Sequence, residues 1–154
     1  MPHLVLEYSG NIRDAVDPER LFRELHRALA PIGGFRPQDF KSRAVRMDQY
    51  LVGDGSREQS FVNLDLRTFA GKNPETTAAL SEAALRVLAD AFPGTLRETA
   101  CDISVQVTLL DRPSYARTRS QESTQQAERP PATPGTPETP ALADTPALPA
   151  PSAV

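Results

Sequence analysis

Residues 60–69, SFVNLDLRTF, alternate between apolar and polar side chains, which is the period of a half-buried β-strand. Asn73-Pro74 follows and is typical of a helix start, with asparagine as the N-cap and proline in the first turn. Apolar residues then recur at helical spacing until Pro93-Gly94. The chain alternates again over CDISVQVTLL at 101–110. This half of the chain therefore predicts a β-α-β unit.

The first half of the chain repeats the same order. PHLVLEY at 2–8 and KSRAVRMDQYLV at 41–52 read as strands. Between them a helix is predicted to begin at Asp17-Pro18, with stop signals at Pro31 and at Gly33-Gly34. Because a crossover helix joins parallel strands, each unit should contain a parallel pair. We therefore expect an α+β fold: duplicated β-α-β units forming a four-stranded sheet with two helices on one face.

The other face of such a sheet, and its edges, need cover of their own. Two helices are enough for one face only. Self-association is the simplest way to cover the second face, so the pattern favours an oligomer.

The C-terminal part has a different composition. Nine of the fifteen prolines follow Leu110, and the segment from 113 to 154 has one aromatic residue and few large aliphatic ones. Such a segment cannot bury enough apolar surface to offset its ordering entropy. We expect a domain at 1–112 and a disordered Pro/Ala/Thr-rich tail at 113–154, biased towards polyproline II.

Composition excludes several classes of protein. The net charge is −3 with acidic and basic residues mixed, so no nucleic-acid or membrane-binding surface is predicted. The lone Cys101 permits no internal disulfide, which suits a reducing cytoplasm. No signal peptide and no membrane-spanning stretch is visible. A cytoplasmic protein acting on a small molecule is the expectation.

Three segments, PHLVLEYSGNI, KSRAVRMDQYLVGDG and FVNLDLRTFAGKNPE, together resemble the 5-carboxymethyl-2-hydroxymuconate Δ-isomerase family of the tautomerase superfamily. The resemblance covers about residues 2–112. It implies a tautomerase-like homotrimer that shifts a proton in an unsaturated keto or enol acid of aromatic catabolism, without a cofactor. The catalyst it implies is Pro2, with its amine exposed by removal of the initiator methionine.

The resemblance also implies which residues bind the carboxylate substrate. These are Lys41, Arg43 and Lys72; the family has arginines at the positions of Lys41 and Lys72, so the planar bidentate fork is absent there. For Pro2 to act as a base at neutral pH, its amine must be unprotonated. Burial and nearby positive charge both lower the pKa of an amine, and these cations are candidates for that charge.

Other interpretations remain open at this point. The enzyme could be a tautomerase for a different keto-enol acid, or the chain could be a non-catalytic trimeric scaffold that displays its proline-rich tail. Pro2 alone would suit any strand start. His3 and His26 have no partner at ligand spacing, so no metal site is predicted, and Cys101 reads as a core residue.

Overall fold

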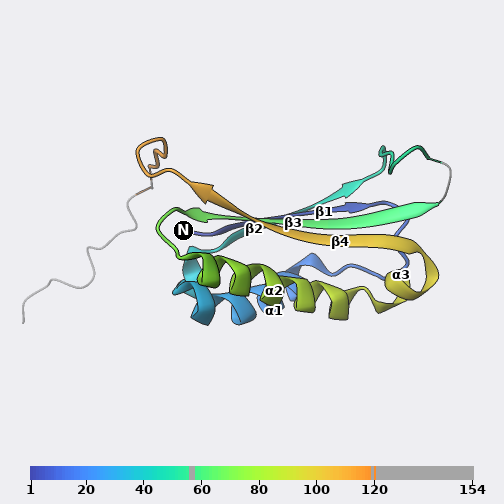
Figure 1. The fold of residues 1–154 in the computed structure, drawn as a ribbon, viewed down its shortest axis with the longest axis horizontal. Helices are drawn as coiled ribbons and strands as arrows, with labels where there is room; N and C mark the ends of the chain where they lie inside the picture. Colours follow the sequence, from blue (N-terminus) through green and yellow to red (C-terminus); the bar gives the residue numbers. More distant parts are fainter. Residues whose placement is uncertain (56–57, 119, 121–154) are drawn as a thin grey trace, which may run out of the picture. The chain divides into compact units, whose positions relative to one another are not determined.

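The computed structural model describes residues 1–55, 58–118 and 120. The predicted disorder of the tail from residue 121 onward lies outside the described residues. Figure 1 shows a sheet with the helices on one side of it. The elements, in chain order, are β1 (His3–Ser9), α1 (Pro18–Gly33), a 3-10 turn (Pro37–Asp39), β2 (Lys41–Met47), β3 (Gln59–Phe69), α2 (Pro74–Ala91), α3 (Pro93–Glu98) and β4 (Ala100–Leu110).

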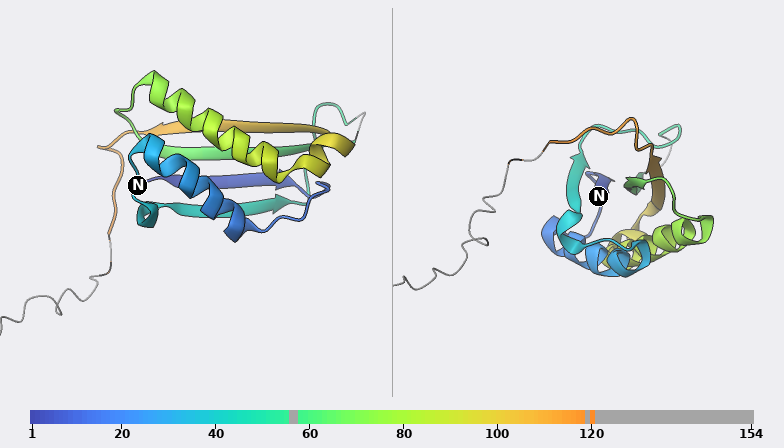
Figure 2. Two further views of the ribbon diagram at one scale, coloured as in Figure 1. Left: turned by 90° about the horizontal axis from the view of Figure 1, so that it is seen from below. Right: turned by 90° about the vertical axis from the view of Figure 1, so that its left-hand side faces the viewer.

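The four strands form one mixed sheet in the order β2-β1-β3-β4. β1 pairs with β2 in parallel, β3 pairs with β4 in parallel, and β1 and β3 are antiparallel neighbours. The two parallel pairs are those that the crossover helices predicted. Figure 2 shows α1 and α2 crossing the same face of the sheet side by side. The predicted duplicated β-α-β architecture is therefore confirmed.

Helix α1 begins as the sequence predicts. The Asp17 side chain accepts a hydrogen bond from the Arg20 backbone N–H at 3.2 Å, and Pro18 occupies the first turn. The helix then passes through Pro31 and ends at Gly33, followed by Gly34 in the left-handed region at φ 63°. Of the two predicted stop signals, only the glycine pair ends the helix. A proline in the last turn removes one backbone hydrogen bond, which a long packed helix tolerates.

Two further boundaries differ from prediction. Pro93 does end α2, but it also begins the short helix α3, because a proline fits the first turn of a new helix. β2 ends at Met47, whereas the pattern predicted a strand as far as residue 52.

The core lies between the sheet and the two long helices. Its members are apolar side chains from the helix-facing positions of β1 and β3 and from the sheet-facing sides of α1 and α2, and each is almost inaccessible to water. The most deeply buried are Leu4, Leu6, Leu25, Leu29, Val62, Leu64, Leu66, Leu80, Ala84 and Leu88. Among the described residues, no helix is long and apolar enough to cross a membrane.

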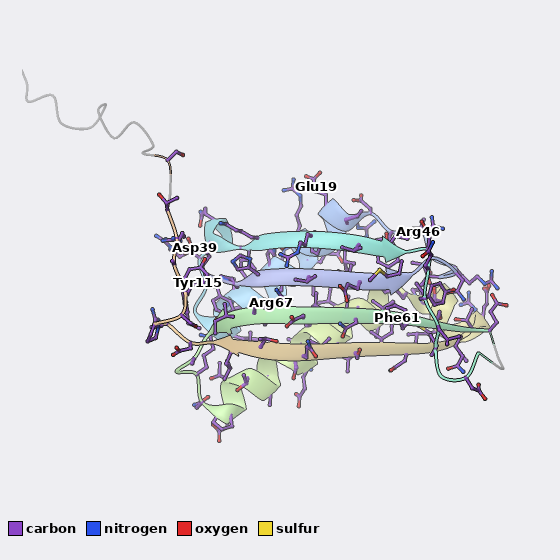
Figure 3. The ribbon with its side chains drawn as sticks, turned by 90° about the horizontal axis from the view of Figure 1, so that it is seen from above. Glu19, Asp39, Arg46, Phe61, Arg67 and Tyr115 are labelled. Atoms are coloured by element: carbon purple, nitrogen blue, oxygen red, sulfur yellow. The ribbon has the colours of Figure 1, made fainter. Side chains whose placement is uncertain are left out.

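The segment after β4 belongs to the same compact unit, which runs from Met1 to Arg117. The Tyr115 ring meets the Phe69 ring edge to face, with centroids 5.1 Å apart, and the Arg112 guanidinium lies 4.6 Å from the same ring centroid. Figure 3 shows this segment passing the strand ends on the side of Asp39. This compact unit extends five residues past Arg112, where the predicted domain 1–112 ends. The domain boundary itself stays a prediction.

Candidate active site

Pro2 lies at the amino end of β1, one of the two inner strands. Its side chain is fully buried, and its carbonyl oxygen accepts a hydrogen bond from the Lys41 backbone N–H at 3.1 Å. That bond joins the start of β1 to the start of β2. Figure 2 shows the amino end among the ends of the strands. The fold therefore holds Pro2 in a fixed position, away from bulk water.

The amino group at this end belongs to Met1 in the full sequence. Burial lowers its pKa below the ordinary value of 8.0. The negative charge of Asp39 raises the pKa, and the positive charges of Arg117, Arg112 and Lys72 lower it. Burial and surplus positive charge are the two effects that favour a neutral amine.

Lys41 and Arg43 lie on β2 and face away from the helices. Lys41 is opposite His3 in the parallel register. Ser42, between the two cations, faces the helices instead, because its hydroxyl is 2.7 Å from the His26 ring nitrogen on α1. Both cations are exposed, and neither side chain has a hydrogen bond or ion pair within the part of the chain that the structure describes. Their charges are therefore available to an anion on the helix-free face.

Lys72 lies in the loop before α2 and is held on the other side of the sheet. Its ammonium donates a hydrogen bond to the Gly33 carbonyl oxygen at 2.8 Å and lies 4.7 Å from the Phe35 ring centroid. The carboxyl end of a helix carries partial negative charge, which stabilises a cation there. The three predicted cations thus flank the end of β1 from two faces of the sheet instead of converging on one point.

Sequence reasoning missed three charged residues at this end of the molecule. Asp39, Arg112 and Arg117 all act on the terminal amine, and the Arg117 guanidinium contacts the Met1 sulfur at 3.1 Å. Arg117 falls in the segment that composition assigned to the tail. No local pattern signals the contact, because it joins the two ends of the compact unit.

His3, which sequence analysis excluded as a metal ligand, is a further polar residue at this end of the molecule. Its Nε2 atom is buried and has no hydrogen-bond partner among residues 1–55, 58–118 and 120. Burial lowers the pKa of His3, and the positive charges of Lys41 and Arg43 lower it further. Both effects disfavour the charged form of the ring, and His3 is opposite Lys41 in the parallel register of β1 and β2.

The remaining candidate groups lie outside this end of the molecule or in its core. Within the described ranges, no three His, Cys, Asp or Glu side chains are placed to hold a metal ion. Cys101 packs against the core, as predicted. A cleft of about 310 Å³ lies at the far end of the helices, where α1 begins and α2 ends, and is lined by Asp14, Arg20, Asp90 and their neighbours. It is remote from Pro2.

Comparison with known proteins matches most of this chain to one family. A family model described as 5-carboxymethyl-2-hydroxymuconate isomerase matches residues 2–122. The chain is 26% identical over 110 residues to a 5-carboxymethyl-2-hydroxymuconate Delta-isomerase of Escherichia coli, covering 71% of this chain and 87% of that protein. A crystal structure of a 5-carboxymethyl-2-hydroxymuconate isomerase from Deinococcus radiodurans is 27% identical, with a TM-score of 0.60 and coverage of 77% and 90%.

More distant structures share the fold. A macrophage migration inhibitory factor-like protein from Entamoeba histolytica is 15% identical, with a TM-score of 0.53, covering 77% of this chain and 96% of that one. The family model spans most of the chain, and the related proteins are isomerases. The chain therefore belongs to the 5-carboxymethyl-2-hydroxymuconate isomerase family, within the tautomerase superfamily, and is an isomerase.

Proposed function

We propose that the protein shifts a proton, without a cofactor, in an unsaturated 2-hydroxy or 2-oxo polycarboxylic acid such as 5-carboxymethyl-2-hydroxymuconate. The Pro2 nitrogen serves as general base and then as general acid. The observation that supports this most directly is the setting of the chain end. Burial and the excess of nearby cations lower the pKa of the Met1 amine, and the same surroundings would act on the Pro2 amine once Met1 is removed. A neutral amine can accept a proton at neutral pH.

The proposal requires removal of Met1. While Met1 is present, the Pro2 nitrogen is part of a peptide bond and has no basic lone pair. The small residue at position 2 favours removal of the initiator methionine. Once Met1 is gone, the free amine belongs to Pro2, whose ring is already buried at the start of β1.

The reaction is a movement of one proton with a shift of double bonds. The Pro2 nitrogen takes the proton from the 2-hydroxyl or an adjacent carbon and returns it to a carbon further along the conjugated chain. Electrons are redistributed within the substrate, so no oxidant or reductant is consumed. Positive side chains stabilise the negative charge that develops on the substrate oxygen.

Lys41, Arg43 and Lys72 are proposed to bind the carboxylates. Lys41 and Arg43 offer unpaired charges on the helix-free face. The Lys72 ammonium uses one of its three donors on the Gly33 carbonyl, which leaves two for substrate. Since these groups stand on different faces, a substrate with two or more carboxylates suits the site.

A homotrimer is proposed as the working form. The fold neighbours include a fused 4-OT symmetric trimer, 17% identical with a TM-score of 0.56. Among the described residues, no helix or strand covers the helix-free face of the sheet (Figure 3), where Tyr50 and Tyr115 pack on Phe61 and Phe69 at the two ends of β3. Packing of this face against other copies would bring Lys41 and Arg43 into a shared, partly enclosed site.

The experiment that tests the function combines intact mass with turnover. The purified protein should have lost the mass of one methionine and should convert 5-carboxymethyl-2-hydroxymuconate, followed by ultraviolet absorbance. Pro2→Ala should lower kcat by at least about a hundredfold, the usual contribution of a positioned general base. Full activity in a chain that retains Met1, or in Pro2→Ala, would refute the proposed role of Pro2.

A second substrate class is favoured by one observation. Lys41 and Lys72 present ammonium groups where the family resemblance implies arginines, and an ammonium does not hold a carboxylate in a bidentate fork. A tautomerase for another keto-enol acid, such as a phenylpyruvate-like monocarboxylate, is consistent with that change. A substrate panel separates the two, because conversion of monocarboxylates alone would exclude the polycarboxylate class.

A further inference from the structure

The segment that follows β4 returns to the amino end of the chain. Arg112 and Tyr115 both contact the Phe69 ring, at 4.6 and 5.1 Å from its centroid. Phe69 is the last residue of β3, and Arg67, two residues earlier, is opposite His3 of β1. The aromatic and cation–π contacts thus fix the segment beside the end of β1 where Pro2 lies.

Beyond this anchor the chain reaches the terminus itself. The Arg117 guanidinium contacts the sulfur of Met1 at 3.1 Å, and Arg117 is otherwise exposed. The positive charges of Arg117 and Arg112 both lower the pKa of the Met1 amine. The neighbouring acid, Asp39, forms an ion pair with Arg36 at 2.9 Å. Positive charge therefore predominates around the amine.

Removal of Met1 would take away the contact partner of the Arg117 guanidinium. Within the part of the chain that the structure describes, the Arg117 side chain contacts the Met1 sulfur, and the proposed function requires Met1 to leave. Loss of Met1 would leave a space next to the Pro2 nitrogen, and the Arg117 guanidinium, which contacts the Met1 sulfur, would border that space. An arginine offers a planar pair of donors, which is the arrangement that binds a carboxylate bidentately.

We propose that Arg117 is a substrate-binding residue that takes a carboxylate in the space vacated by Met1, with Arg112 and Tyr115 as positioning residues that hold the segment on Phe69. The proposal rests on the proposed function for its substrate class. It also supplies the bidentate donor that lysines at 41 and 72 do not provide. The first residues beyond the predicted domain are then part of the binding site rather than of the tail.

The test compares Arg117→Ala and Arg117→Lys with Arg86→Ala as matched control. Arg86 is an exposed arginine on α2, remote from the amino end. We expect Arg117→Ala to raise KM about tenfold with kcat little changed, which is the size of one charge-assisted hydrogen bond made in both ground and transition states. Arg117→Lys should recover part of the loss, and Arg86→Ala should match the wild type.

Two truncations localise the effect along the chain. A chain ending after Ser120 keeps Arg117 and should retain the wild-type KM. A chain ending after Arg112 lacks Arg117 and should show the raised KM. Equal KM values for the two truncations would overturn the proposal, as would equal losses in Arg117→Ala and Arg86→Ala.

A binding measurement separates this proposal from the proposed function. Adipate, an unreactive dicarboxylate, is titrated calorimetrically into the wild type and Arg117→Ala after intact mass has shown that Met1 is absent. A Kd about tenfold weaker in the variant supports the role of Arg117 even if no substrate is turned over. Unchanged adipate affinity overturns it, even if the wild type proves to be an active isomerase.

Discussion

The basicity of the amine at the amino end of the chain depends on the few charges around it. Burial lowers the pKa of the Met1 amine most; Asp39 raises it, whereas Arg117, Arg112 and Lys72 lower it further. The Pro2 amine, freed by loss of Met1, would stand among the same charges. No single cation therefore controls the amine. Charge substitutions on either side of this balance should move the pKa in opposite directions, which distinguishes an electrostatic effect from general damage to the site.

The pH dependence of kcat/KM reports the pKa of the catalytic amine, and so the balance of the charges around it. Removing the positive charge in Arg117→Ala should raise the pKa of the amine, so the acidic limb of the profile moves to higher pH. Removing the negative charge in Asp39→Asn should lower the pKa, so the limb moves to lower pH. The measurement is kcat/KM from pH 5 to 9 at low ionic strength, and shifts of the same sign in both variants would contradict the argument.

At the level of the elements, sequence patterns predicted what depends on local periodicity. The alternation over residues 60–69 and 101–110 and the caps at Asp17 and Asn73 correspond to strands and helices of the structure. The patterns did not predict α3 or the passage of α1 through Pro31. Both depend on tertiary packing, which can override a local breaker.

Helix α3 has a tertiary anchor that local sequence could not show. The Asp14 carboxylate, in the loop after β1, accepts hydrogen bonds from the backbone N–H groups of Gly94 and Thr95 and from the Thr95 hydroxyl, at 2.6–3.0 Å. Burial raises the pKa of Asp14, but these hydrogen bonds outweigh it and lower the pKa overall. The loop thereby joins the two β-α-β units.

Loss of this anchor should destabilise the fold. Asp14→Ala leaves three donors without their acceptor, so we expect the free energy of unfolding to fall by about 2 kcal/mol. Because the folded pKa of Asp14 is lowered, the contribution is present above its unfolded value of 3.8 and is lost as pH falls through the folded pKa. Urea denaturation at pH 7 measures the change.

A matched control keeps that prediction specific. Glu82 is an exposed carboxylate on α2, and Glu82→Ala should alter the free energy of unfolding by less than about 0.5 kcal/mol. If Asp14→Ala were no more destabilising than Glu82→Ala, the Asp14 hydrogen bonds would not be the anchor of α3.

At the scale of the whole molecule, the candidate site is built from segments distant in sequence. Pro2 comes from the start of β1, Lys41 from β2, Lys72 from the loop before α2, and Arg117 from beyond β4. The family resemblance could indicate the first three, because their motifs are local. It could not indicate Arg117, whose contact with Met1 exists only because the fold brings both ends of the unit together.

The proposed trimer makes its own prediction about the helix-free face. Val45 lies on that face of β2 and is 39% exposed, whereas Leu85 is 41% exposed on the solvent side of α2. A charge placed in an interface is costly, but the same charge on a solvated helix is tolerated. Val45→Asp should therefore dissociate the assembly, and Leu85→Asp should leave its mass unchanged.

Light scattering measures the mass of the assembly, with three chains of 16.8 kDa expected for the wild type. A wild-type protein that is monomeric, or equal masses for the two variants, would remove the helix-free face as the contact between copies.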